Sequence, residues 1–177
     1  MLIDTREQSV LSFPLSLLVT AVETVTLPVG DYACLFKDGT QPPVVFERKS
    51  LADLFGTMTS GYPRFKREMV KAKQLGLTLI LIIEGTLTDV LGGTIHSSMA
   101  GASLLQKLFT LQVRYGLQPV FCDGRQEMSR YIVETYAAIG RNYVWPNAAL
   151  PHTSALPSKS AQGIIVPTTR RAVGLPG

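Results

Sequence analysis

The sequence predicts an α/β sandwich with a mixed central sheet. Near the start, two strand-like runs flank the turn dipeptide Asp38–Gly39, which indicates an antiparallel hairpin. After this hairpin, helix-like and strand-like segments alternate, as in sheets whose parallel strands are connected by helices. Leu77–Ile83 is apolar except for Thr78, which is typical of a strand buried on both faces. These three observations place a mixed sheet between layers of helices.

The first half of the chain supplies an N-terminal strand, a helix and the hairpin. Leu2–Asp4 has the composition of a short first strand. Ser12–Val22 has leucines and valines at helical spacing and a proline in its first turn, so a short helix is expected there. Val25–Phe36 and Pro43–Arg48 are predicted to be the two strands of the hairpin.

Two helices are expected between the hairpin and the next strand. Ser50 is a suitable N-cap for the first, which runs from Leu51 to Met58 with Asp53 in its first turn. The pair Ser60–Gly61 interrupts the helical pattern, and Pro63 restarts it at an N1 position. The buried stripe predicted for this second helix is Phe65, Met69 and Ala72.

The remaining elements complete the sandwich. Leu77–Ile83 is expected to be the central strand of the sheet. Ser97 or Ser98 is expected to cap a long helix, in which Leu104–Tyr115 carries a core stripe at helical spacing. A shorter strand and a final helix follow, at Gln118–Cys122 and Gln126–Ile139.

Composition restricts the class of protein. A chain of 177 residues with 46% hydrophobic residues suits one domain with a substantial core, expected over residues 1–145. Residues 146–177 are rich in proline, serine and threonine and carry only basic charges, which predicts a flexible basic tail. The sequence shows neither the pattern of a signal peptide nor an apolar run long enough for a membrane span, so neither is expected. Cys34 and Cys122 each lie in an apolar run and favour reduced thiols over a disulfide, so a soluble cytoplasmic protein is expected.

Basic residues are concentrated after the hairpin. The formal net charge is +4, and the segment from Val44 to Leu75 contains seven basic residues but only three acidic ones. Several of them share a face of the second predicted helix, which is either a solvated surface or a surface that binds phosphates. The candidate phosphate contacts are Arg64, Lys66, Arg67 and Lys71.

A carboxylate and an ammonium lie at the end of the second strand of the hairpin. Side chains alternate along a strand, so Glu47 and Lys49 are expected on one face and Arg48 on the other. A charged triplet of this kind is most often a solvated surface. Here, however, Asp31 closes an earlier strand-like run, and Asp4 with Glu7 closes the first one. Ends of strands can converge at one edge of a sheet, where open α/β folds place their sites.

These acidic side chains are hard oxygen ligands, which suit Mg²⁺ or Mn²⁺. The chain has two histidines, His96 and His152, and no CxxC pair, so a structural zinc site is not expected. A divalent cation would neutralise charge at a phosphodiester and activate water for its hydrolysis. Lys49 could orient the water or neutralise the phosphate.

The segments IDTRE, VGDY and FERKSLADL occur in this order, and together they resemble the nuclease domain of the XPF-type structure-specific endonucleases, a branch of the PD-(D/E)XK superfamily. The likeness extends through GTMTSGYPRFKRE, LILIIEG and LQVRYGLQPVFCDGRQE, and covers residues 2–142. It implies a restriction-endonuclease-like three-layer sandwich. The helicase domain and helix-hairpin-helix repeats that family members carry have no counterpart in the sequence, which leaves junction selectivity and the usual dimer arrangement open.

The resemblance also implies roles for single residues. Asp31 and Glu47 would bind the cation, with Asp4 and Glu7 contributing, and Lys49 would be the catalytic lysine. The positions that match supporting residues of the family are Arg6, Arg48 and Asp53.

The function expected from these observations is a Mg²⁺- or Mn²⁺-dependent endonuclease that cuts branched, forked or flap DNA in repair, recombination or replication. One alternative is a catalytically silent module that binds DNA through the same bases. Another is a scaffold that forms a homodimer through the Leu104–Tyr115 helix, whose stripe is otherwise simply core. Neither a membrane nor a nucleotide cofactor is expected as a partner.

Overall fold

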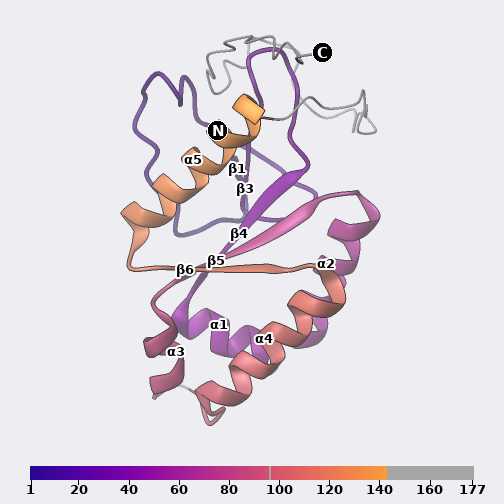
Figure 1. Cartoon of the computed structure of the whole chain (residues 1–177), viewed down its shortest axis with the longest axis vertical. Coiled ribbons are helices and arrows are strands. Elements are labelled where there is room, and N and C mark those ends of the chain that lie inside the picture. Colours follow the sequence, from indigo (N-terminus) through magenta and orange to yellow (C-terminus); the bar gives the residue numbers. More distant parts are fainter. Residues whose placement is uncertain (96, 143–177) are drawn as a thin grey trace, which may run out of the picture.

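A six-stranded sheet forms the middle of the molecule and is covered on both faces (Figure 1). The computed structural model describes residues 1–95 and 97–142, so the predicted tail at 146–177 lies outside the described residues. The strands are β1 (Leu2–Asp4), β2 (Glu23–Val25), β3 (Tyr32–Ala33), β4 (Val44–Ser50), β5 (Thr78–Glu84) and β6 (Gln118–Cys122). The helices are α1 (Leu51–Met58), α2 (Tyr62–Gln74), α3 (Leu87–Gly92), α4 (Gly101–Tyr115) and α5 (Arg125–Asn142).

The sheet is mixed, as predicted. Its strand order is β2-β1-β3-β4-β5-β6. The pairs β1–β2, β4–β5 and β5–β6 are parallel, whereas β3 is antiparallel to both β1 and β4. The prediction that the apolar strand at Leu77–Ile83 is central was wrong in position. β5 is an interior strand buried on both faces, but β3 and β4 occupy the middle of the order because the N-terminal strands add to the other side.

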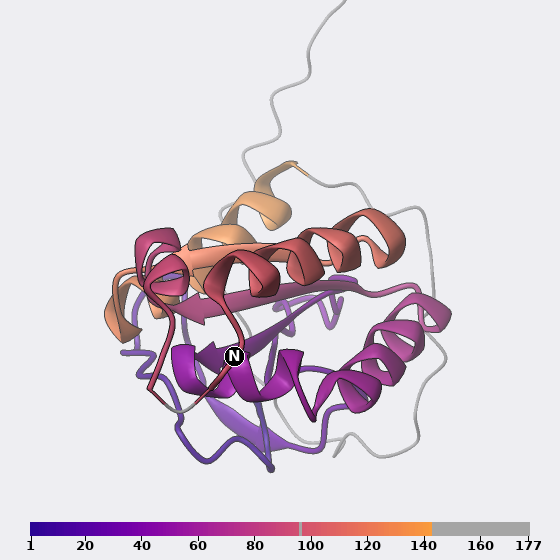
Figure 2. The ribbon, with the colours of Figure 1, turned by 90° about the horizontal axis from the view of Figure 1, so that it is seen from below.

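Each face of the sheet has its own core. The layer of α1, α2, α3 and α4 covers one face, onto which Figure 2 looks. Leu54, Leu81 and Leu108 are fully buried in this core. On the other face, α5 and the N-terminal connection cover the sheet, with Ile82 and Ile132 among the buried residues. The result is the three-layer sandwich that the resemblance implies.

The N-terminal connection between β1 and β2 is irregular, so the helix expected over Ser12–Val22 was wrong. The exposed fractions of Leu15 and Leu17 are 70% and 83%, whereas Phe13 is buried. The Ser16 hydroxyl accepts hydrogen bonds from the backbone N–H groups of Leu18 and Val19. Such local side-chain bonds offer the backbone an alternative to a helix. The connection is instead fixed from outside, because Arg125 of α5 donates to the Ser9 and Val10 carbonyls.

The strand predicted at Val25–Phe36 is also interrupted. β2 ends at Val25 and pairs with β1, and β3 pairs with β4. Between them, Gly30 has φ +77°, and a Cβ built on it would lie 2.9 Å from the Phe46 carbonyl oxygen. The turn therefore approaches β4 so closely that the position requires glycine.

The helices follow the predicted pattern with two differences. Ser50 caps α1 by accepting a hydrogen bond from the Asp53 N–H, and Pro63 lies in the first turn of α2, as expected. The cap expected at Ser97 or Ser98 was wrong, because α4 begins at Gly101 after Ala100. A Cβ on Gly101 would lie 2.0 Å from a backbone oxygen of α3, so packing of α3 against α4 fixes this start. The helix α3, with its Thr86–Asp89 capping box, was not predicted.

The core stripe expected on the helix α4 is confirmed. The α4 stripe of Leu104, Leu108 and Leu111 is buried and belongs to the core. Cys34 and Cys122 are both buried, and they do not form a disulfide. In the described part of the chain, no helix is long and apolar enough to cross a membrane.

Candidate active site

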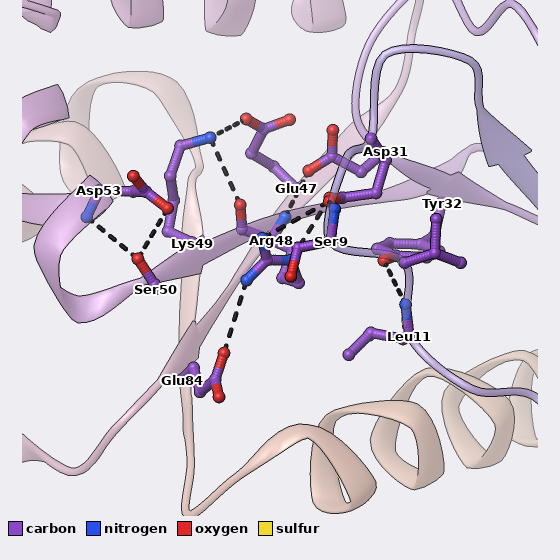
Figure 3. Close-up of polar contacts among 12 residues, drawn as sticks. Ser9, Leu11, Asp31, Tyr32, Glu47, Arg48, Lys49, Ser50, Asp53 and Glu84 are labelled. Atoms are coloured by element: carbon purple, nitrogen blue, oxygen red, sulfur yellow. Dashed lines mark hydrogen bonds and ion pairs between the residues drawn. The ribbon is translucent and has the colours of Figure 1, made fainter.

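The hairpin of β3 and β4 brings Asp31 beside Glu47. Asp31 directly precedes β3, and its backbone N–H donates to the Phe46 carbonyl at 2.7 Å. Its carboxylate accepts a hydrogen bond of 2.8 Å from the Arg48 N–H. Figure 3 shows the side chains of Asp31, Glu47 and Lys49 on the same side of β4. The alternation predicted for this strand is confirmed, because Arg48 leaves it on the opposite face.

Glu47 and Lys49 form a direct ion pair on the face covered by the helical layer. The side chains are 8% and 18% exposed. Burial would lower the pKa of Lys49, but the charge of Glu47 and the hydrogen bond to it outweigh this effect and raise the pKa. The ammonium is therefore held in its charged form beside the two carboxylates.

Both carboxylates occupy surroundings that oppose their ionisation. Burial raises the pKa of Asp31 to about 6 and that of Glu47 to about 8. The charge of Asp31 adds to the rise at Glu47, while Lys49 opposes it. Such perturbed carboxylates are typical of functional sites, although structural ion pairs also produce them. A cation between them would relieve the repulsion.

The donor set fits a hard cation that also takes oxygen ligands from water or substrate. Within residues 1–95 and 97–142, no group of three or more His, Cys, Asp or Glu side chains is arranged to hold a metal ion. Asp31 and Glu47 are two neighbouring carboxylates, and Mg²⁺ is commonly bound through one or two carboxylates with waters and substrate phosphates completing its shell. These two residues are therefore the candidates for holding the ion.

The backbone of Asp4 lies beside that of Asp31, but the Asp4 carboxylate binds groups outside the candidate site. Its backbone N–H donates to the Asp31 carbonyl at 2.8 Å. Its carboxylate, in a residue that is 1% exposed, accepts from Arg6 Nε at 2.6 Å and from the Leu27 N–H at 2.6 Å. Burial favours the neutral form, but the hydrogen bonds from Arg6 and Leu27 outweigh it and lower the pKa of Asp4. Asp4 and Arg6 thus fix the chain beside Asp31.

Glu7 lies on the opposite side of the sheet from Glu47. Its carboxylate pairs with Arg48 at 3.3 Å, and both side chains are less than 9% exposed. Arg48 also approaches Glu84 of β5 at 3.5 Å, and Arg125 approaches Glu84 at 3.8 Å. Burial opposes the charge of Arg48, but Glu7 outweighs it and raises the pKa of the guanidinium. The structure therefore places Glu7 in a buried network with Arg48, on the other side of β4 from Glu47, while its charge still reaches Asp31 and adds to the rise in the pKa of that carboxyl.

A cavity of about 370 Å³ opens beside Glu47 and Lys49, between β4 and the first two helices. Asp53 lines it while its carboxylate accepts from the Ser50 hydroxyl at 2.7 Å. Arg64 of α2 also lines the cavity. The other candidate phosphate contacts, Lys66, Arg67 and Lys71, are exposed on α2. The site, its cavity and the basic helix thus lie together.

Glu68 is a site residue that the sequence analysis missed. It lines the same cavity, and its Oε1 accepts a long hydrogen bond, 3.4 Å, from the Gly30 N–H. Its charge acts on Asp31, Glu47 and Lys49. A signal was available in the sequence, because Glu68 is the one acid of a basic helix and follows Arg64 by one helical turn.

Comparison with known proteins supports this architecture. The model of the ERCC4 domain matches residues 3–135. Two similar solved structures are XPF from Aeropyrum pernix and XPF from Aeropyrum pernix in complex with DNA, each 19% identical in sequence, with TM-scores of 0.54 and 0.55. The matches cover 76% and 81% of this chain but 63% and 66% of those chains, which is slightly less than two thirds of their length.

No curated protein matches the sequence. The family match nevertheless spans most of the chain, and the mixed sheet with its helical layers is shared with the two solved structures. The chain therefore belongs to the ERCC4 domain family, and its fold is that of the XPF-type nuclease domain.

Proposed function

We propose that the protein is an endonuclease that hydrolyses phosphodiester bonds in DNA with the help of Mg²⁺ or Mn²⁺. The observation that carries the proposal is the meeting of two buried carboxylates, Asp31 and Glu47, with the ammonium of Lys49 beside a cavity. Membership of the ERCC4 domain family supports the reaction class. The solved complex of an XPF with DNA supports DNA as the substrate.

In the proposed mechanism, Asp31 and Glu47 hold the cation. When bound, the cation supplies a polarised phosphate and an activated water. Lys49 holds a proton at Nζ and donates hydrogen bonds to the attacking water or to the charge that develops on the phosphate. Arg64 of α2 lines the cavity, and the other exposed bases of the same helix bind neighbouring phosphates. Asp4 and Glu7 act by fixing the chain around the site, through Arg6 and Arg48.

The substrate proposed is DNA with branches, forks or flaps, which would place the protein in repair, recombination or replication. The cavity and the flanking basic helix would accommodate a strand that leaves a duplex. Two buried cysteines that are not joined in a disulfide suit a reducing compartment, so we propose that the protein acts inside the cell. A second copy of the chain is a further proposed partner, for which α4 offers the exposed side chains of Phe109 and Val113.

A cleavage panel tests the proposal. Purified protein is incubated with duplex, flap, fork and four-way-junction DNA, with Mg²⁺, with Mn²⁺ and with a chelator. Cleavage that needs the cation and favours branched DNA is expected. Binding to DNA without cleavage at any cation concentration would indicate the silent module instead. Oligomerisation without salt-dependent DNA binding would indicate a scaffold, since phosphate contacts weaken steeply with added salt.

A further inference from the structure

In the structure, the Glu47 carboxylate is engaged in an ion pair with Lys49. The proposed function needs the same carboxylate to bind a cation. Lys49 Nζ contacts Glu47 Oε1, and the pair is largely buried. A divalent ion bound to Glu47 would repel the ammonium, since like charges a few ångströms apart cost free energy in a partly buried site. Lys49 must then leave Glu47. An ammonium left buried without a partner is strongly disfavoured, so it needs another acceptor nearby.

Few charged acceptors face Lys49. Its Nζ also donates to the Arg48 carbonyl, but this is a long contact of 3.4 Å to a neutral group. Asp31 would itself hold the cation. Asp53 is engaged by Ser50, because its Oδ2 accepts from the Ser50 hydroxyl and its backbone N–H donates to Ser50 Oγ. Glu68 lines the same cavity as Lys49, and its charge acts on Lys49 in the structure. Its Oε1 accepts only a long hydrogen bond, from Gly30. Across the described residues, no group donates to its other oxygen, Oε2.

We propose that Glu68 is a positioning residue that receives the Lys49 ammonium when Glu47 binds a divalent cation. The proposal rests on the proposed function, because it assumes a cation at Glu47. Lys49 has a flexible four-carbon side chain that can move its ammonium across the cavity while the strand stays fixed. Arg64 also lines the cavity, but it forms no ion pair with Glu68 in the part of the chain that the structure describes. Glu68 is therefore available to Lys49.

A double-mutant cycle on cation affinity tests the proposal without any measurement of cleavage. Mg²⁺ and Mn²⁺ binding is measured by titration calorimetry for the wild type, Glu68→Gln, Lys49→Ala and the double variant. Glu68→Gln removes the charge but keeps an amide oxygen for the Gly30 N–H. We expect it to weaken cation binding by about tenfold, which is a typical size for the coupling between neighbouring charged residues. In the Lys49→Ala background the same change should have less than about a twofold effect, because no ammonium needs an acceptor.

Two further variants sharpen the cycle. Glu68→Asp keeps the charge and should recover most of the lost affinity. Glu134→Gln, at an exposed acid of α5 in the other layer, is the matched control and should leave cation binding unchanged. Thermal unfolding without cation confirms that each variant is folded.

The outcomes separate this proposal from the proposed function. If Glu68→Gln weakens binding equally with and without Lys49, Glu68 acts on the cation itself and the positioning role is overturned. An unchanged affinity in both backgrounds overturns it as well. If the wild type binds neither cation, the proposed function falls, and this inference falls with it.

Discussion

Asp31 and Glu47 are residues whose charged forms the fold disfavours. Burial raises the pKa of both carboxyl groups, and each stands near the other. Stability would be higher if these positions were neutral, since buried charges need partners. Arrangements that lower stability in this way recur at functional sites. At the scale of the residue, the candidate site therefore lowers the stability of the fold, as the proposed binding of a cation would require.

Replacing Asp31 by Asn should abolish cleavage and stabilise the cation-free protein. The folded pKa of about 6 lies above the ordinary value of 3.8, so the folded state binds the proton more tightly than the unfolded state. Wild-type stability therefore falls as the pH rises from about 4 to about 6. Asp31→Asn avoids this loss, and we expect it to be more stable at pH 7.5 by about 1–3 kcal/mol.

Two measurements check this prediction. Thermal unfolding without cation should show the gain at pH 7.5 and no gain near pH 4. Cleavage should fall by at least about 100-fold. An equally active variant would remove Asp31 from the site, and Glu134→Gln serves as the control that should change neither property.

Cleavage should rise with pH between about 6 and 8. Asp31 and Glu47 must lose their protons to hold the cation, and their pKa values are about 6 and about 8. Because the cation competes with protons for the same oxygens, a higher Mg²⁺ concentration should move the midpoint to lower pH. Single-turnover rates from pH 5.5 to 9 at two Mg²⁺ concentrations measure this effect. A rate that falls across the range would contradict the assignment.

At the scale of the element, β4 carries two separate charge systems. Its face toward the helical layer bears Glu47 and Lys49, and its other face bears Arg48, which approaches Glu84 (Figure 3). Arg48 also pairs with Glu7. The first system opens onto a cavity, whereas Arg48 and Glu7 are buried. The strand thus joins a candidate site to a structural network that holds the N-terminal connection in place.

Glu7→Ala should destabilise the protein by about 3 kcal/mol. The substitution leaves the buried guanidinium of Arg48 with only its 3.5 Å contact to Glu84, and breaking one side of a buried ion pair is costly. Urea unfolding monitored by circular dichroism measures the change. Glu134→Ala, at an exposed position, should cost less than about 0.5 kcal/mol. A loss for Glu7→Ala as small as that of the control would show that the network contributes little to stability.

Local patterns predicted the elements that depend on their own residues. The apolar run of β5 and the cap and proline of the first two helices were readable because periodicity and capping act over a few residues. The prediction of a helix at Ser12–Val22 failed because Leu15 and Leu17 face solvent and the distant Arg125 fixes the chain just before this segment. α3 had a readable capping box, but it spans six residues and gave no periodic pattern.

The candidate site was predictable to the extent that strand alternation determines it. Glu47 and Lys49 share a face because they are two residues apart. Glu7 could not be placed, since it follows β1 in an irregular connection that turns to the other face of the sheet. Glu68 stands out in the sequence as the one acid of a basic helix, but its approach to the turn at Gly30 depends on how α2 packs against the hairpin, which helical spacing alone does not encode.

At the scale of the whole molecule, the exposed bases of α2 lie on the same side of the sheet as the cavity. α2 presents its exposed bases next to the cavity, while α5 lies across the sheet from it (Figure 1). A surface of this kind attracts phosphates over several ångströms and releases counterions when they bind. The binding of DNA should therefore depend on α2 far more than on α5.

Charge reversal on α2 and on α5 tests which of the two helices binds DNA. The double variant Arg64→Glu with Lys71→Glu should weaken DNA binding by about tenfold or more and reduce the slope of log affinity against log salt by about 2. The matched control is Arg130→Glu with Arg141→Glu, two exposed bases of α5 that should leave the slope nearly unchanged. Fluorescence anisotropy at a series of salt concentrations measures both. Equal slopes for the two variants would remove α2 from the DNA surface.

The bonds from α5 to early segments have a consequence for the newborn chain. Arg125 reaches the Ser9 carbonyl across 116 positions of sequence, and the Tyr136 hydroxyl donates to the Val44 carbonyl at 2.9 Å. A ribosome releases β1 to β5 before these late residues emerge, so one side of β4 lacks its covering helix until α5 has been synthesised. Fragments that end before α5 therefore lack the hydrogen bonds that hold β4 and the N-terminal connection beside the candidate site.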